Sequence, residues 1–165
     1  MKAIVNVMID EELRSIKFDV DLDSLPVLEF DGYEVVAKWK VDNFDNNKTF
    51  YTDSNGLEMQ KRVLNYRATW NFNDSLAASN ENITGNFYPV NSALTMMTVD
   101  NTRILSISND RSQSASAIEA GEIQFMQNRR IPADDGYGMG EILDEKDEFG
   151  NGIRVPATYY FYLDN

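Results

Sequence analysis

The sequence predicts an all-β fold, an antiparallel β-sandwich, and three observations support this. Apolar and charged residues alternate strictly in the run IKFDVDLDSL at 16–25, similar runs recur along the chain, and turn-rich spacers such as DNFDNNK separate them. A period of two residues places one face of a strand in a core and the other face in water. Seven or more short strands without a convincing long helix are typical of a sandwich.

The run at 16–25 is the clearest strand, because Ile16, Phe18, Val20 and Leu22 alternate with charged residues. The segment KAIVNVMI near the start is also strand-like. The segment SAIEAGEI indicates a helical turn, although Gly121 disfavours a helix there. Further strand-like patterns lie at 33–41, 57–64, 94–99, 103–108, 122–129 and 157–163.

Composition limits the possible classes of function. The chain has 165 residues, of which 42% are hydrophobic, and neither a repeat nor a linker divides it, so residues 1–165 are expected to form a single β-sandwich domain or a fragment of one. A net charge of −12 argues against an electrostatic nucleic-acid binder, which needs clustered Lys and Arg. No apolar run approaches the roughly 18 to 20 residues that cross a bilayer. The start has no pattern of a signal peptide, so we expect no targeting signal in this chain.

The chain contains no cysteine and no histidine. It therefore has no thiolate nucleophile, no zinc–thiolate site, no imidazole base and no His-ligated metal. Any catalysis by this chain alone would depend on carboxylates. We expect no metal site and no cofactor in it.

One spacer has the pattern of a tight hairpin turn. In FYTDSNGLEMQKR, residues 50–62, Asp53 can bond its own downstream backbone and Gly56 can take the positive φ of a short loop, so Asp53, Asn55 and Gly56 are expected to form a structural turn. The alternative is a metal or sugar contact through Asp53.

Three peptides together resemble a known family. They are FYTDSNGLEMQKRVLNYRATW, ITGNFYPVNSALTM and NDRSQSASAIEAGEIQFMQNRRIPADDGYGMGEIL, and they follow one another in the order and spacing of the C-terminal β region of glycoside hydrolase family 38 α-mannosidases. The lysosomal branch is the more similar one. The resemblance is clearest over residues 34–165.

The resemblance implies a fold and a function. Enzymes of this family are zinc-dependent, retaining exo-α-mannosidases, and their C-terminal β region is a galactose mutarotase-like supersandwich. Their zinc ligands and their nucleophile lie outside the region that this chain resembles. The chain is therefore expected to complete or shield the active site of a separate catalytic domain, and not to hydrolyse mannosides alone.

The loop NRRIPADDGYGMGE, residues 128–141, is the main candidate site. By resemblance, Arg129, Arg130, Asp134, Asp135 and Gly138 match a family peptide on the side that faces the catalytic domain. Three interpretations remain open: an internal clamp between Arg129 and Asp134 or Asp135, a loop that also reaches the mannose-binding cleft, or a loop with no special role. Strand alternation favours the clamp by placing Arg129 on the face of Ile123 and Phe125. Glycines 136, 138 and 140 are explained by the turn alone.

The chain departs from the family pattern at two places. Tyr137 stands where the family commonly has arginine, and a tyrosine cannot replace a planar cation but can stack on a sugar face. Ser114 and Ala115 stand where the lysosomal branch tends to have glycine, which predicts a reshaped loop if those glycines have positive φ. The neighbouring pair Asp110 and Arg111 is expected to brace that loop, with a sugar site as the alternative.

Three N-x-S/T sequons begin at Asn47, Asn73 and Asn82 and are possible glycosylation sites. They agree with the lysosomal or secreted location that the resemblance implies. The expected partners are the catalytic domain of the same α-mannosidase and mannose-containing glycans, with no nucleic acid and no membrane. The alternative function is a free-standing carbohydrate-binding or interaction module derived from such an enzyme.

Overall fold

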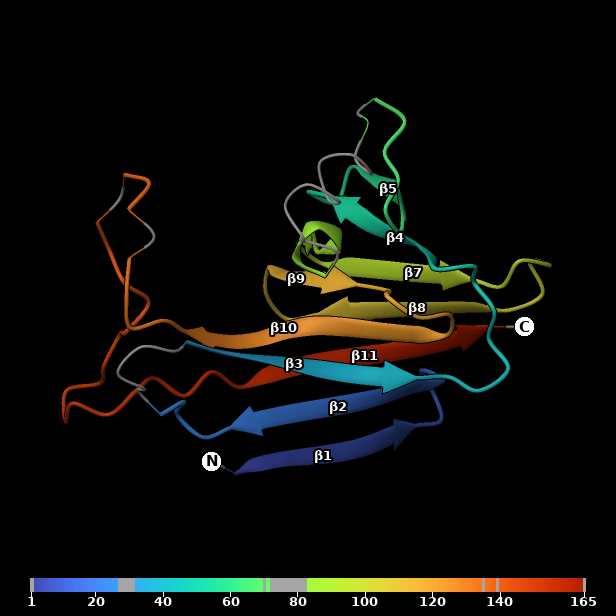
Figure 1. Cartoon of the computed structure of the whole chain (residues 1–165). Coiled ribbons are helices and arrows are strands. Elements are labelled where there is room, and N and C mark those ends of the chain that lie inside the picture. The colour runs from blue at the N-terminus through green and yellow to red at the C-terminus, as the bar shows by residue number, and fades with distance from the viewer. Residues whose placement is uncertain are drawn as a thin grey trace.

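The structure, a computed structural model, describes residues 2–26, 32–69, 71, 83–134, 136–138 and 140–164 (Figure 1). In these residues two antiparallel sheets face each other, which confirms the predicted all-β sandwich. One sheet has seven strands in the order β1-β2-β11-β8-β7-β4-β5, and the other has four in the order β3-β10-β9-β6. The strands are β1 (Ala3–Asp10), β2 (Ser15–Leu22), β3 (Tyr33–Lys40), β4 (Thr49–Ser54), β5 (Glu58–Val63), β6 (Tyr88–Val90), β7 (Ala93–Met97), β8 (Ile104–Asn109), β9 (Gln113–Ser116), β10 (Glu122–Arg130) and β11 (Ala157–Asp164), with a 3₁₀ turn η1 (Thr84–Asn86) before β6.

The strands with regular alternation agree with the sequence prediction. Strand β2 lies within the expected 16–25 run, except that it begins one residue earlier, and it buries Val20 and Leu22 as the pattern requires. The short strands β6 and β9 have no clean alternation, so the sequence did not predict them. The helical turn expected at SAIEAGEI was wrong: residues 117–121 form an irregular turn between β9 and β10.

A cluster of aromatic rings joins the two sheets. Trp39 of β3 lies edge-on to Phe18 at 5.7 Å and to Tyr159 at 4.8 Å, and its ring centroid is 5.1 Å from that of Phe161. Phe18 belongs to β2, and the other two rings belong to β11. Strand β3 therefore packs over β11 and β2, and these contacts contribute packing energy beyond the apolar area that they bury.

Strand β10 contains a β-bulge at Gln127. Its pairing with β3 runs Phe125 to Ala37 and Met126 to Val36, but then Asn128, not Gln127, pairs with Val35. The extra residue is buried, and its side-chain amide lies between the sheets, where Nε2 donates to the Val155 carbonyl at 2.8 Å. A bulge inserts one residue into the strand, so the side chains after it exchange faces relative to regular alternation.

Tyr159 holds Gln127 in this position. The Tyr159 hydroxyl donates to Gln127 Oε1 at 2.9 Å and accepts from Gln113 Nε2 at 2.8 Å. The ring is fully buried, and burial raises the pKa of Tyr159 to about 12. The phenol therefore stays protonated and continues to donate this hydrogen bond.

Gly121 closes the turn before β10 at a place where only glycine fits. Its φ is +71°, and an added Cβ would lie 2.7 Å from the carbonyl oxygens of both Phe44 and Val41. Its N–H donates to Asn46 Oδ1 at 2.9 Å. The backbone conformation and the close approach of two main-chain oxygens both require the absence of a side chain.

We expect Gly121→Ala to destabilise the fold by roughly 2 to 4 kcal/mol, because it adds a backbone clash to the cost of a positive φ. Gly56→Ala is the matched control, since Gly56 has the same φ of +71° with nothing within 4 Å of its added Cβ. That control should cost only about 1 to 2 kcal/mol. Urea unfolding of both variants measures the difference, and equal losses would show that the close approach at Gly121 has no energetic weight.

Candidate functional site

The segment after β10 leaves the sandwich as a long excursion before the chain returns in β11 (Figure 1). We call residues 131–143 the projecting loop, of which 135 and 139 lie outside the described part of the chain. Its two ends are joined at the base, where the Ile131 N–H donates to the Leu143 carbonyl at 3.1 Å. The candidate site from the sequence lies mainly on this loop.

Arg130 anchors the base of the loop. Its Nε donates to Asp144 Oδ1 at 2.6 Å, Nη2 lies 2.5 Å from the same oxygen, and Nη1 donates to the Leu25 carbonyl. The guanidinium packs against Gly152, where an added Cβ would clash with Nη1. The Arg130 side chain is only 11% exposed, so this buried fork joins β10, the segment after the projecting loop and the segment after β2.

Asp144 is kept ionised by its two cationic neighbours. The hydrogen bond from Arg130 is the main cause that lowers the pKa of Asp144, burial opposes it, and Lys146, whose Nζ is 3.2 Å from Oδ2, lowers the pKa further. Asp144 could not be singled out from the sequence, because it lies in an acidic run with no recognisable motif. Its role follows from the fold alone.

The expected clamp between Arg129 and Asp134 does not form, so only the alternative with Asp135 stays untested. Arg129 is exposed, and its Nε lies 3.6 Å from Glu34 of β3, a surface pair of little energetic weight. The bulge at Gln127 is the reason, since it turns Arg130 inward and Arg129 outward. Asp134 instead accepts the Gly136 N–H at 3.1 Å within the loop, and Asp135 lies outside the described residues.

The tip of the projecting loop is strongly exposed. Tyr137 is 94% exposed between two glycines of positive φ, with φ of +77° at Gly136 and +130° at Gly138. Gly140 also has a positive φ, of +68°. These turns leave the Tyr137 side chain almost fully exposed at the tip of the loop.

Asp53 connects two hairpins from inside the protein. Its Oδ1 accepts three backbone N–H groups, from Asn91 at 2.8 Å, Ser92 at 3.0 Å and Ala93 at 3.2 Å, and its Oδ2 accepts the Gly56 N–H at 3.1 Å and the Ser92 hydroxyl at 3.1 Å. The residue is 4% exposed. Asp53, Asn55 and Gly56 lie at the β4–β5 turn, and the carboxylate also fixes the β6–β7 turn, which sequence reasoning did not foresee.

Burial of Asp53 raises its pKa, but the four backbone N–H donors outweigh burial, so the pKa lies below its ordinary value. The carboxylate is saturated with donors and belongs to the fold. This geometry leaves its oxygens occupied by the protein and gives no support to a metal or sugar contact.

Within the segment at 110–117, residues 110 and 111 form a bend and residues 113–116 form strand β9. Ser114 and Ala115 lie in β9, neither has a positive φ, and Ala115 is fully buried against β6 and β10. Arg111 donates to the Pro156 carbonyl, and its Nε lies 4.0 Å from Asp110. Arg111 thus links this segment to Pro156, the residue before β11.

Three further observations concern metal binding, membrane spans and the predicted glycosylation sites. No group of three or more Asp or Glu in the described residues is arranged to hold a metal ion, and none of their helical segments is long and apolar enough to cross a membrane. Asn47 is exposed in the turn before β4, and the other two sequon asparagines, Asn73 and Asn82, lie outside the described residues.

Comparison with known proteins identifies similar sequences. The model of the family "Glycosyl hydrolases family 38 C-terminal domain" matches residues 1–137. Lysosomal alpha-mannosidase of Bos taurus is 34% identical over 151 residues, which cover 92% of this chain and 14% of that protein. The human protein of the same name is 33% identical with the same coverage, and alpha-mannosidase of Canavalia ensiformis is 34% identical over 93% of this chain and 15% of its own length. The chain thus spans about a seventh of the length of these relatives.

We expect Arg130→Ala to loosen the base of the projecting loop, because it removes the contact between Arg130 and Asp144 and leaves Asp144 with the contact to Lys146. Hydrogen exchange at the Ile131 amide, which bridges the loop base, should accelerate several-fold. Arg129→Ala is the matched control, since the neighbouring arginine is exposed, and it should leave this rate nearly unchanged. Equal acceleration in both variants would contradict the assignment of the clamp to Arg130.

We expect Asp53→Asn to lower the free energy of unfolding at pH 7 by roughly 2 to 3 kcal/mol, since an amide accepts fewer and weaker hydrogen bonds than a carboxylate. Because the folded pKa of Asp53 is depressed, its contribution is complete above the unfolded value near 3.9 and is lost as pH falls through the folded value. Urea unfolding at pH 7, 5 and 3 should show an unchanged difference at the first two and a smaller one at the last. A variant as stable as the wild type at pH 7 would be inconsistent with the hydrogen-bond network.

Proposed function

Because this chain belongs to the glycosyl hydrolases family 38 C-terminal domain family, we propose that it is the supporting domain of a zinc-dependent retaining α-mannosidase. The membership agrees with the resemblance found in the three peptides. In this proposal the parent enzyme hydrolyses terminal α-mannosyl residues of glycans. The chain completes or shields an active site that a separate catalytic domain carries.

The observation that carries the proposal is the family match, which extends from residue 1 to residue 137 and so runs into the projecting loop. This loop leaves the sandwich on a base that Arg130 fixes, and it ends in an exposed aromatic ring. A rigidly anchored, outward loop is suited to reach a neighbouring domain. Its anchoring lowers the entropy that would be lost when it closes over a substrate.

The division of chemistry follows from the side chains present. Retention by double displacement uses two carboxylates, and zinc supplies a Lewis acid and a template for sugar hydroxyls when it is bound. The residues of this chain do not fit a zinc site, since it has no histidine or cysteine and its described carboxylates form no metal-holding group. We therefore assign zinc to the catalytic domain. The contribution of this chain is to position the loop and exclude water.

Lysosomal or secreted residence belongs to the same proposal, because two of the relatives above are lysosomal enzymes by name. The charges of this chain agree with an acidic compartment. With no histidine, no side chain has an ordinary pKa between about pH 5 and 7. The structural carboxylates Asp53 and Asp144 have lowered pKa values, so both contacts persist at such pH.

The second candidate, a free-standing carbohydrate-binding module, is favoured by Tyr137 alone. An exposed ring between glycines can stack on the apolar face of a sugar without a catalytic partner. This candidate requires the isolated chain to bind mannosides by itself. The first candidate requires a catalytic domain.

Activity measurements separate the two candidates. We expect the purified chain to show no turnover of an aryl α-mannoside, and we expect co-expression with an α-mannosidase catalytic portion from the same genome to give a complex whose activity a zinc chelator removes. In that complex, Tyr137→Ala should lower kcat/KM by about threefold to tenfold if the ring touches the sugar. Leu57→Ala is the control, since Leu57 is 88% exposed on a different hairpin.

Zinc-dependent turnover by the isolated chain would overturn the supporting role. Mannoside binding by the isolated chain in calorimetry, lost in Tyr137→Ala, with no associating catalytic portion, would favour the free-standing module. The reading frame upstream of Met1 gives an inexpensive further check, because metal-ligand aspartates and histidines encoded there favour the first candidate.

A further inference from the structure

The two sheets of the sandwich do not cover each other completely. The larger sheet ends in β2 and then β1, whereas the smaller sheet ends at β3. The Trp39 contacts place β3 over β11 and β2, so no described strand faces β1. All eight residues of β1 are exposed. They include Val5, which pairs with Val20 of β2, and Val7, which pairs with Phe18 of β2.

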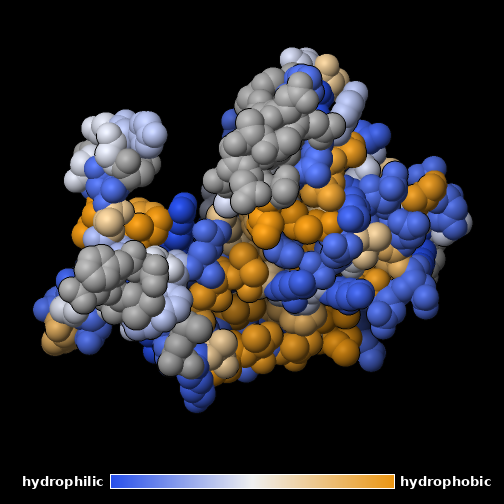
Figure 2. Space-filling model, in the orientation of Figure 1, coloured by the Kyte–Doolittle hydropathy of each residue, from blue (hydrophilic) through white to orange (hydrophobic). Residues whose placement is uncertain are grey.

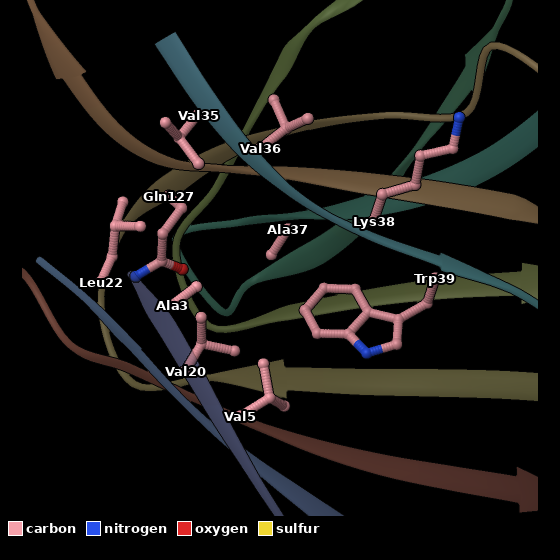
Figure 3. Close-up of a pocket in the computed structure, with 10 residues that line it drawn as sticks. All are labelled: Ala3, Val5, Val20, Leu22, Val35, Val36, Ala37, Lys38, Trp39 and Gln127. Carbon is pink, nitrogen blue, oxygen red and sulfur yellow. The ribbon is translucent and has the colours of Figure 1, made fainter. Parts of the chain in front are cut away.

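We call the uncovered strand β1, together with the neighbouring part of β2, the overhang of the larger sheet. An apolar groove lies between this overhang and β3. It has a volume of about 240 Å³, and its walls are Ala3, Val5, Val20 and Leu22 on one side and residues 35–39 of β3 on the other, with Gln127 at one end. Figure 3 shows Ala37 and Trp39 on the side of β3 that faces Val5 and Val20. A second hollow of about 260 Å³ continues past Trp39, along Ile16 and Phe18. Figure 2 shows apolar side chains gathered on this part of the surface.

The groove also has an open backbone edge beside it. Strand β3 pairs with β10 on one side, and no described strand pairs with its other side. An edge of this kind presents unpaired N–H and C=O groups. A strand added there would form hydrogen bonds with those groups. Because successive side chains of a strand point to opposite faces, every second side chain of the added strand would pack on β1 and β2.

We propose that a β-strand from the preceding part of the longer α-mannosidase polypeptide adds to the free edge of β3 and fills this groove. The inference rests on the proposed function, because it names the surface that receives the partner. The relatives are about seven times longer than the matched region, and the family is a C-terminal domain by its description, so most of their remaining chain precedes that region. The strand has alternating apolar residues, which contact Val5, Val20 and Trp39.

A second copy of this chain is the less suitable occupant. Each copy carries a net charge of −12, so two copies repel each other at low ionic strength. A strand of the same polypeptide, in contrast, is held beside the edge at a high effective concentration. A strand of the same polypeptide would then pair with the open edge of β3 and cover the apolar overhang.

The chain's lack of cysteine allows a direct test by thiol labelling. Val5→Cys places a thiol in the groove, at a position that is 52% exposed, and Leu57→Cys places a control thiol on the β4–β5 hairpin. Each variant is labelled with N-ethylmaleimide, alone and in the complex with the co-expressed catalytic portion, and the rate is followed by mass spectrometry of this chain. We expect the complex to slow labelling of Val5→Cys by about tenfold or more, while Leu57→Cys labels at similar rates in both states.

Equal labelling of Val5→Cys in both states of an active complex would overturn this inference and leave the proposed function intact. Protection that appears in the isolated chain and increases with its concentration would also overturn it, because a second copy would then occupy the groove. If no complex forms and no mannosidase activity appears, the proposed function fails, and this inference fails with it.

Discussion

The β-bulge at Gln127 is the constraint on which the projecting loop depends. It adds one residue to β10, so every later side chain of that strand exchanges faces, and Arg130 turns inward while Arg129 turns outward. Tyr159 holds the bulge residue, because its hydroxyl donates a hydrogen bond to Gln127. Burial raises the pKa of Tyr159, so the hydroxyl stays protonated. The inward arginine then binds Asp144 and the Leu25 carbonyl, and this fork fixes where the loop leaves the sandwich.

Much of the fold could be predicted from the sequence, because burial on one face of a strand leaves a period of two residues. This holds for β2, whose alternation is strict, and for β10 as far as Phe125. The candidate site was less predictable, because a prediction from a period of two residues assumes a strand without a bulge. A bulge leaves no mark in a pattern of apolar and polar residues, so regular alternation selected the wrong arginine. Asp144 is distant from any motif, and the donors to Asp53 are backbone groups that no side-chain pattern reveals.

Two exposed features of the sandwich bear on the proposed function. One is the exposed tip at Tyr137, and the other is the apolar overhang of β1 beside the open edge of β3. In our proposal, the first reaches toward a substrate cleft of a larger enzyme, and the second is the place where a strand is added. The electrostatics agree with this view, because the carboxylates that hold the hairpins and the loop base have lowered pKa values and remain ionised in mildly acidic surroundings.

We infer that the projecting loop, fixed by Arg130, faces the catalytic domain of an α-mannosidase. A structure of the chain in complex with that domain tests it most directly, through the solvent exposure of the loop. We expect Tyr137, which is 94% exposed in this chain, to become buried beside the mannose-binding cleft, while the contact between Arg130 and Asp144 is unchanged. A complex in which the loop stays in solvent and points away from the cleft would contradict it.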